Sequence, residues 1–243
     1  MRIYGINPVL EALRAGRVTA LRVSSRSDER HAEIARLAAD QGIPVRRANA
    51  GELDRFAQRG AHQGVVADVR DAEEFSIEEL VGSARGVPLI VVLDGIEDPH
   101  NVGAILRTVD AAGADGVVRQ SRHAAPLSGA AAKVSAGAVS HVRIADVVNI
   151  ARSLEALKAA GVWTVGLAGD SAVSYDSVDL TLPTAFVVGA EGTGLRRLVK
   201  ERCDWVVSIP MAGHVQSLNV SVATGIALFE ALRQRRAKGG VPA

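Results

Sequence analysis

The chain has 243 residues, of which 48% are hydrophobic and 23% are charged, a composition that indicates one or two globular domains and excludes a disordered chain. No apolar run approaches the roughly 20 residues that a membrane-spanning helix needs, and the N-terminus lacks the apolar core of a signal peptide. The single cysteine, Cys203, excludes an internal disulfide and fits a reducing compartment. We therefore expect a cytoplasmic protein.

The net charge of +1 is unevenly distributed along the chain. Residues 1–70 carry 12 arginines against 8 acidic residues, a net of +4, whereas residues 71–86 carry one arginine against 5 acidic residues, a net of −4. The first segment could therefore contact nucleic acid. A small basic excess is also common on solvated surfaces, so this signal alone is weak.

Helices and strands alternate in residues 1–70, which predicts a compact α/β unit. Asn7 and Pro8 predict the start of a helix that Gly16 ends, and Asp28 predicts the cap of a second helix. A third helix is predicted over residues 52–58. Strands are predicted over residues 20–24, 43–46 and 65–69.

Residues 71–86 have a weak apolar period and read as an acidic linker with about one helical turn. The apolar run of residues 88–93 predicts a strand that is covered on both faces. Asn101 is expected to cap a helix that ends at Gly113, and Ser153 to cap another. Strands are predicted over residues 116–118, 142–144, 162–167, 185–188 and 206–209, and a final helix over residues 219–236.

Three glycine-bearing loops follow apolar strands, at residues 166–169, 189–194 and 210–219. Glycine lets a backbone turn tightly and approach a ligand closely. Such loops at neighbouring strand ends predict one small-molecule pocket, although each alone could be an ordinary turn. The polar side chains of Glu191, Ser217 and Asn219 beside these turns favour the pocket.

The sequence lacks the motifs of several common enzyme classes. It has no G-x-G-x-x-G after its first strand, no Gly-Lys-Ser/Thr phosphate loop and no Gly-x-Ser-x-Gly elbow. Its six histidines and one cysteine are scattered, so we expect no metal site. Cys203 could be a nucleophile or a packed side chain.

Three motifs nevertheless carry a specific resemblance. Asn101-Val-Gly-Ala-Ile-Leu-Arg107, Gly189-Ala-Glu-Gly-Thr-Gly194 and Ile209-Pro-Met-Ala-Gly-His-Val-Gln-Ser-Leu-Asn219 resemble, in order and spacing, the signatures of SpoU (TrmH-type) RNA 2′-O-ribose methyltransferases. Tyr4-Gly-Ile-Asn-Pro8, His62-Gln-Gly64 and Lys133-Val-Ser-Ala-Gly-Ala138 extend the resemblance to the RlmB-type enzymes of this family, which methylate a guanosine ribose in 23S rRNA. One departure is that His214 and Gln216 stand where serines are frequent.

The resemblance implies a fold that elementary rules would not predict. It implies an α/β SPOUT methyltransferase domain at residues 87–243 with a deep C-terminal trefoil knot, an exception to the rule against knots. It also implies an L30e-like RNA-binding domain at residues 1–70, joined by the linker of residues 71–86. By the same resemblance the protein would be a homodimer, to which the apolar side chains of Val222, Ile226 and Phe229 on the last helix could contribute.

The resemblance also implies roles for particular residues, with S-adenosylmethionine as cofactor, RNA as partner and no metal or membrane. Methyl transfer to a ribose 2′-hydroxyl would depend on Arg107, Asn101, Glu191, Ser217 and Asn219. The residues that would bind the cofactor are Gly166, Leu167, Ala168, Gly169, Gly189, Gly192, Ile209, Met211, Leu218 and Asn219. The residues that would bind RNA are Tyr4, His62, Gln63 and Lys133.

The sequence leaves alternative functions open. A non-catalytic rRNA-binding or ribosome-assembly protein could keep the same fold, although all five residues expected for methyl transfer are present. Related enzymes act on tRNA or on other rRNA sites. A nucleotide-dependent oxidoreductase would need the G-x-G-x-x-G loop that the sequence lacks.

Overall fold

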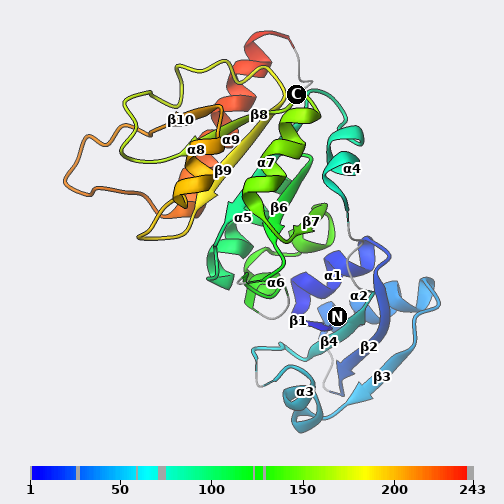
Figure 1. Cartoon of the computed structure of the whole chain (residues 1–243). Coiled ribbons are helices and arrows are strands. Elements are labelled where there is room, and N and C mark those ends of the chain that lie inside the picture. Colours follow the sequence, from blue (N-terminus) through cyan, green and yellow to red (C-terminus); the bar gives the residue numbers. More distant parts are fainter. Residues whose placement is uncertain are drawn as a thin grey trace. The chain divides into compact units, whose positions relative to one another are not determined.

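A computed structural model describes residues 2–25, 28–58, 60–70, 75–122, 124–127 and 130–239 (Figure 1). The chain divides into two compact units. The first comprises Met1–Ala72, Val102–Arg107 and Pro126–His141, and the second comprises Glu73–Asn101, Thr108–Ala125 and Val142–Ala243. Each unit contains its own sheet, which makes the fold α/β in both.

The first unit is built on a four-stranded sheet with the order β1-β4-β2-β3, in which β2 and β3 are parallel and the other pairs antiparallel. Its strands are β1 (Arg2–Tyr4), β2 (Val18–Ser24), β3 (Val45–Ala48) and β4 (Val65–Val69). Its helices are α1 (Ile6–Arg14), α2 (Glu29–Asp40), α3 (Ala50–Phe56), α6 (Ala130–Val134) and the 3₁₀ turn η1 (Ala138–Ser140).

The two faces of this sheet differ in character. Ile3, Leu21 and Ala67 pair across the strands and are buried on the face where α1 and α2 pack. Tyr4, Val66 and Arg22 alternate with them and lie on the opposite face, where the short helix α3 packs and Arg46 of β3 is exposed. Part of the second face is therefore open to solvent.

The predicted elements of this unit are present, with corrections at their ends. Asp28 caps α2 by accepting a hydrogen bond from the backbone N–H of His31 at 3.0 Å, as expected. Asn7 does not cap α1, because this helix begins at Ile6 after Gly5, whose φ of 97° suits only glycine. The short strand β1 was not predicted, because three residues are too few to establish an alternating pattern.

The second unit is built on a six-stranded parallel sheet with the order β10-β8-β9-β5-β6-β7. The strands are β5 (Leu89–Asp94), β6 (Gly116–Gln120), β7 (Ile144–Val147), β8 (Trp163–Leu167), β9 (Thr184–Gly189) and β10 (Trp205–Val207). The helices are α4 (Ile77–Gly82), α7 (Ile150–Ala159), α8 (Arg197–Arg202) and α9 (Val220–Ala237), together with the two ends of α5 (Pro99–Ala112).

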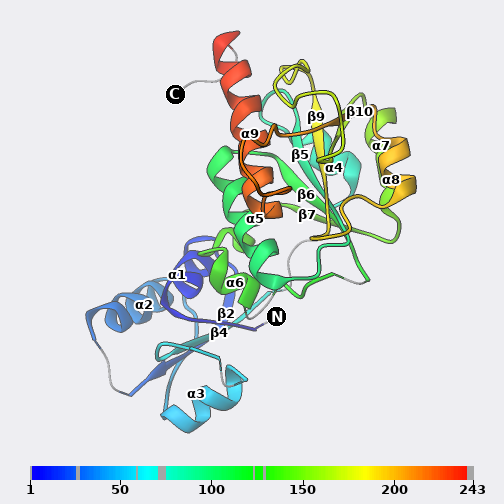
Figure 2. The same ribbon diagram turned by 90° about the vertical axis from the view of Figure 1, so that its left-hand side faces the viewer.

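Helices cover both faces of this sheet. Figure 2 shows α9 on one face and α7 with α8 on the other. The central strands β5 and β9 are buried along almost their whole length, as the continuous apolar run of β5 predicts. Alternate residues of these strands, such as Ile90 and Val187, join one core cluster with Leu154 and Leu157 of α7.

Several predicted boundaries in this unit are wrong. Asn101 is the third residue of α5 rather than its cap, because Asp98 caps the helix and Pro99 occupies its first position. Ser153 lies inside α7, where its hydroxyl donates to the carbonyl of Asn149, the true cap. Gly113 ends α5 in the left-handed conformation, as predicted, with φ of 65°.

The acidic segment between the two sheets is partly helical. Ser76 and Glu79 form a reciprocal capping box at the start of α4, and Ile77 and Leu80 are buried in the core of the second unit. Residues 71–74 of the predicted linker lie outside the described residues. No helix within the described ranges is both long and apolar enough to span a bilayer.

Candidate active site

Three loops at the carboxyl ends of β8, β9 and β10 line one pocket of the second unit, with a volume of about 670 Å³. This volume falls in the range of about 300–1,000 Å³ that is typical of small-molecule sites. The pocket is lined by residues 167–170, 188–195, 200, 207, 209, 211, 216–220 and 223. The prediction that the glycine-bearing loops form one pocket is thus confirmed by the geometry.

The loop after β9 is tight because its glycines permit it. The Gly194 N–H donates to the carbonyl of Ala190 at 2.8 Å, and these two residues form an isolated bridge. A Cβ on Gly189 would lie 2.1 Å from the carbonyl carbon of Gly194. Gly192 and Gly194 have φ values of 78° and 66°, which L-residues rarely adopt. The loop therefore exposes backbone groups toward the pocket.

Asn219 connects residues from all three motifs. Its side-chain amide donates to Asn101 Oδ1 at 2.9 Å and to Glu191 Oε1 at 2.8 Å. Its side-chain oxygen accepts from the backbone N–H of Ser221 at 2.9 Å and so caps α9. Asn101 is buried, whereas Glu191 and Asn219 are exposed. The cap fixes the orientation of the amide, and the amide then fixes the carboxylate of Glu191.

The pocket contains nearly all of the predicted cofactor-binding residues. Leu167, Ala168, Gly169, Gly189, Gly192, Ile209, Met211, Leu218 and Asn219 all line it. Gly166 is the exception, because a Cβ there would approach Leu195 Cδ1 and Cys203 Sγ at 2.9 and 3.0 Å. Gly166 is thus required for packing behind the pocket rather than in its lining.

The volume and the lining of the pocket are compatible with S-adenosylmethionine. Leu167, Ile209 and Leu218 supply apolar walls suited to an adenine ring, and the glycine loop supplies backbone donors and acceptors. Sequence reasoning missed an ion pair at the rim, in which Lys200 Nζ contacts both carboxylate oxygens of Asp170 at 2.7 Å. That hydrogen bond and the positive charge lower the pKa of Asp170. These two residues are separated by 30 positions, so no local pattern could have revealed the pair.

Arg107 lies on α5, six residues after Asn101, which is about 9 Å along a helix axis. Its side chain is exposed, and its guanidinium has no hydrogen bond or ion pair with any residue that the structure describes. An arginine without an internal partner is free to meet an external anion.

The residues predicted to bind RNA all lie in the first unit. Two of them, His62 and Gln63, also make contacts within this unit. Gln63 Oε1 accepts the backbone N–H of Ile6 at 3.1 Å, and the Gln63 carbonyl contacts His31 Nε2 at 2.8 Å. His62 Nε2 contacts Asp54 Oδ1 at 3.2 Å. The His62-Gln-Gly64 turn is therefore held internally. Lys133 is exposed on α6.

The open face of the four-stranded sheet, on which Tyr4 lies, carries cationic side chains. The guanidinium carbons of Arg2 and Arg22 lie 4.8 and 4.1 Å from the ring centre of Phe56. Both arginines pair with Asp68, and Arg46 is exposed beside Arg22 on the same face. Tyr4 and Phe56 both pack against a buried cluster of Ala48, Leu53, Ala57 and Val66. This face keeps a positive surplus beside an aromatic ring.

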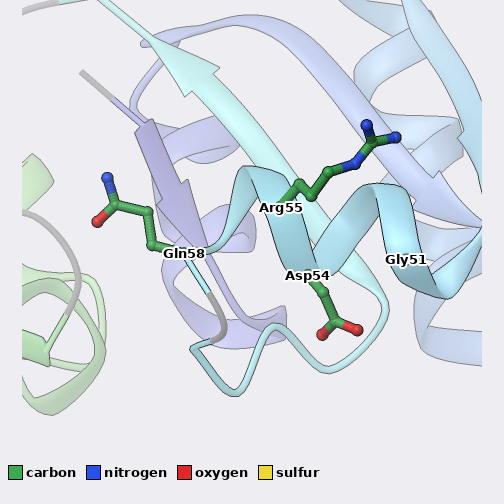
Figure 3. A pocket seen from close by; sticks show the side chains of 4 residues that line it. All are labelled: Gly51, Asp54, Arg55 and Gln58. Atoms are coloured by element: carbon green, nitrogen blue, oxygen red, sulfur yellow. The ribbon is translucent and has the colours of Figure 1, made fainter.

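A shallow concavity also lies along α3, lined by Gly51, Asp54, Arg55 and Gln58. The three side chains point in different directions in Figure 3, and they converge on no common point. Because its lining has no apolar side chain and no convergent polar groups among the described residues, we assign the small-molecule site to the pocket at the strand ends.

Cys203 is packed rather than poised for catalysis. Burial raises the pKa of its thiol to about 12, and the thiol donates to the carbonyl of Val199 at 3.3 Å. A thiolate is thus strongly disfavoured at neutral pH. Across the described ranges, no group of three His, Cys, Asp or Glu side chains is arranged to hold a metal ion.

Comparison with known proteins identifies the family of the chain. The profile of the SpoU rRNA Methylase family matches residues 88–229, and that of an RNA 2′-O ribose methyltransferase substrate-binding domain matches residues 2–75. The chain is 46% identical to the 23S rRNA (guanosine-2′-O-)-methyltransferase RlmB of Pseudomonas syringae pv. tomato, over 98% of this chain and 97% of that protein.

Solved structures lead to the same family. The SpoU methyltransferase AviRb from Streptomyces viridochromogenes, in complex with AdoMet, superposes with a TM-score of 0.82 at 28% identity, covering 98% of this chain and 91% of AviRb. The A. aeolicus TrmH/SpoU tRNA-modifying enzyme covers 66% of this chain and 81% of its own, at 36% identity and a TM-score of 0.58. The chain therefore belongs to the SpoU family of RNA methyltransferases.

Proposed function

We propose that this protein transfers a methyl group from S-adenosylmethionine to the 2′-hydroxyl of a ribose in RNA, and that the target is a guanosine of 23S rRNA. The observation that carries the proposal is the contact of Asn219 with both Asn101 and Glu191 at the edge of the glycine-lined pocket. Relatives of nearly full length that bear the name 23S rRNA (guanosine-2′-O-)-methyltransferase support the choice of target.

The pocket is the proposed cofactor site. When bound, S-adenosylmethionine supplies an electrophilic methyl carbon on a sulfonium. Leu167, Ile209 and Leu218 would hold the adenine, and the backbone of the 189–194 loop would orient the rest of the molecule. Ser217 and Asn219, which also line the pocket, would face the methyl-accepting side.

The acceptor hydroxyl must lose a proton as its oxygen attacks, and we assign its activation to Arg107. The guanidinium of an arginine is a delocalised cation. We therefore infer that the charge of Arg107 stabilises the forming alkoxide, while a phosphate oxygen or water accepts the proton. Asn101, Glu191, Ser217 and Asn219 would position the ribose and the arginine. The exposed guanidinium, which pairs with no side chain or backbone group in the described ranges, is compatible with this role.

The first unit would hold the RNA. Its family profile is that of a substrate-binding domain, and we propose an L30e-like domain at residues 1–70 that follows RNA through Tyr4, His62, Gln63 and the arginines of the open sheet face. Lys133, outside that range but in the same compact unit, would add a phosphate contact. Residues 71–86 would act as the linker.

We further propose that residues 87–243 form a SPOUT domain with a trefoil knot, and that two chains associate through α9. Val222 and Phe229 support the dimer, because their side chains are 48% and 51% exposed on one side of α9. A protein that modifies rRNA would work in the cytoplasm, which agrees with its single, unpaired cysteine.

Two measurements separate this function from its alternatives. Titration calorimetry with S-adenosylmethionine should show saturable binding, and its absence would favour a non-catalytic RNA-binding protein. Mapping ribose methylation in rRNA and tRNA from a deletion strain, with and without complementation, should show loss and recovery at one guanosine of 23S rRNA. Loss in tRNA instead would reassign the substrate.

A further inference from the structure

A fully buried carboxylate lies at the carboxyl end of the central strand. Asp94 ends β5, and its side chain has an exposed fraction of 0%. Its two oxygens accept three donors of one residue, Arg196: the backbone N–H at 2.8 Å, Nε at 2.6 Å and Nη2 at 2.5 Å. Burying a charge is costly unless it is paired and hydrogen-bonded. This carboxylate meets both conditions through Arg196.

Arg196 follows directly after the loop that lines the pocket. Leu195, the residue before it, is buried against the core, and the Ala190–Gly194 bridge closes the loop. Arg196 also reaches β6, where its Nη2 donates to Gln120 Oε1 at 3.0 Å. Asp94 and Arg196 therefore tether the exit of the 190–195 loop to the ends of two central strands.

The other side of the same loop is held by the hydrogen bond between Glu191 and Asn219. Glu191 accepts from Asn219, which also donates to Asn101 on α5. Asp94 and Asn101 are only seven positions apart in the chain. The contacts thus form a closed circuit, in which Asp94–Arg196 fixes one side of the loop and Asn101–Asn219–Glu191 fixes the other.

We propose that Asp94 is a positioning residue for methyl transfer, which acts through Arg196 to hold the 190–195 loop so that Glu191 keeps its contact with Asn219. This inference rests on the proposed function of the pocket. Asp94 itself would touch neither the cofactor nor the ribose, because it is sealed beneath Arg196. Its removal should impair the turnover step rather than the affinity for RNA.

The test compares Asp94→Asn with Asp204→Asn in the full-length chain. The control Asp204 accepts from Thr164 N and Oγ1 at 2.8 and 2.7 Å and pairs with Lys158. It lies at the opposite ends of β8 and β10 from the pocket, since it precedes Trp205 and contacts the start of β8. We expect kcat to fall at least about tenfold in Asp94→Asn, because small displacements in a site have large kinetic effects. The KM for RNA should stay within about twofold, and Asp204→Asn should keep kcat.

Two further readouts distinguish positioning from general destabilisation. Amide hydrogen exchange at residues 190–195 and 219–221 should accelerate in Asp94→Asn and not in Asp204→Asn. The kcat losses of Asp94→Asn and Glu191→Ala should not multiply in the double variant, because both act through the same contact. Arg196→Lys should retain more activity than Arg196→Met, since the lysine keeps the positive charge.

Equal kcat in Asp94→Asn and Asp204→Asn, unchanged exchange of the loop, or losses that multiply with Glu191→Ala would each overturn the positioning role. A wild-type chain without methyl transfer would instead overturn the proposed function. Loop exchange would still decide whether Asp94 holds the loop in that case.

Discussion

Individual polar residues in this protein differ in how many hydrogen bonds they make with the rest of the chain. The side chain of Asn219 makes four hydrogen bonds, two as acceptor from Ser221 at the helix cap and two as donor to Asn101 and Glu191. Arg107 makes no hydrogen bond or ion pair with a described residue. A residue with several internal contacts organises a site, whereas an exposed, unpaired charge is available to a ligand.

Replacing Arg107 with alanine should lower methyl transfer at least about a hundredfold, which is the scale of losing one preorganised donor. Binding of S-adenosylmethionine, measured by calorimetry, should be unchanged. Arg152, exposed on α7, is a matched control whose alanine variant should keep full activity. Near-normal single-turnover rates in Arg107→Ala would remove this residue from the mechanism.

The lysine variant of Arg107 distinguishes two chemical roles. Lysine keeps the positive charge but loses its proton more easily than arginine. A rate for Arg107→Lys that rises with pH between about 8 and 10, toward the usual lysine pKa, would indicate a general base. A rate that is flat or falls over this range would support stabilisation of the alkoxide by charge.

Cys203 should react slowly with iodoacetamide in the folded protein at pH 8, because burial raises the pKa of its thiol to about 12. Unfolding in denaturant should restore rapid labelling. Mass spectrometry of the labelled chain measures both rates. Fast labelling of the native protein would show that the thiol is exposed and ionised.

At the scale of elements, the last helix is anchored by a buried arginine. Arg235 of α9 donates through Nε, Nη1 and Nη2 to four carbonyls, those of Leu180, Val87, Pro88 and Leu182, at 2.6–3.0 Å. Burial lowers its pKa, and Asp115 partly offsets this effect. The four carbonyls belong to two segments that flank the central strands, so α9 depends on this side chain for its attachment.

Arg235→Met should lower the free energy of unfolding by at least about 2 kcal/mol, since it removes four hydrogen bonds from a charged donor. The neighbouring Arg236 is exposed, and Arg236→Met should change this free energy by less than about 0.5 kcal/mol. Urea denaturation followed by circular dichroism measures both. Equal stability of the two variants would contradict the anchoring role.

The open face of the four-stranded sheet should supply RNA affinity. We expect Arg46→Ala to weaken RNA binding and to reduce its salt dependence, because one phosphate contact is lost. Arg36 lies on α2, which covers the other face, and Arg36→Ala should bind RNA as the wild type does. Filter binding at several salt concentrations tests this, and equal effects of the two variants would reject the sheet face as the RNA surface.

Local sequence patterns predicted many of these elements but few of their contacts. The apolar run of β5, the Asp28 cap and the Gly113 stop depend on neighbouring residues, and all are confirmed. The strand order and the Asp94–Arg196 tether join positions that are about a hundred residues apart, so periodicity contains no information about them. Asn101 was misjudged as a cap because Asp98, Pro99 and Asn101 offer competing start signals.

At the scale of the whole molecule, the exposed apolar side chains of α9 allow the proposed dimer to be tested. If Val222 and Phe229 are covered by a second chain, light scattering at micromolar concentration should give twice the mass of one chain. Phe229→Glu should then shift the protein toward monomer without unfolding it, since this side chain is half exposed in the single chain. A wild-type protein that is monomeric at these concentrations would contradict the proposed dimer.

Methyl transfer to a ribose 2′-hydroxyl of RNA is the proposed reaction. It is tested most directly by incubating the purified full-length chain with isotopically labelled S-adenosylmethionine and unmodified 23S rRNA, followed by nuclease digestion and mass spectrometry of the nucleosides. The account predicts that the label appears in 2′-O-methylguanosine at a single site and that Arg107→Ala abolishes it. Label on a base, or no transfer by a protein that binds both substrates, would contradict the account.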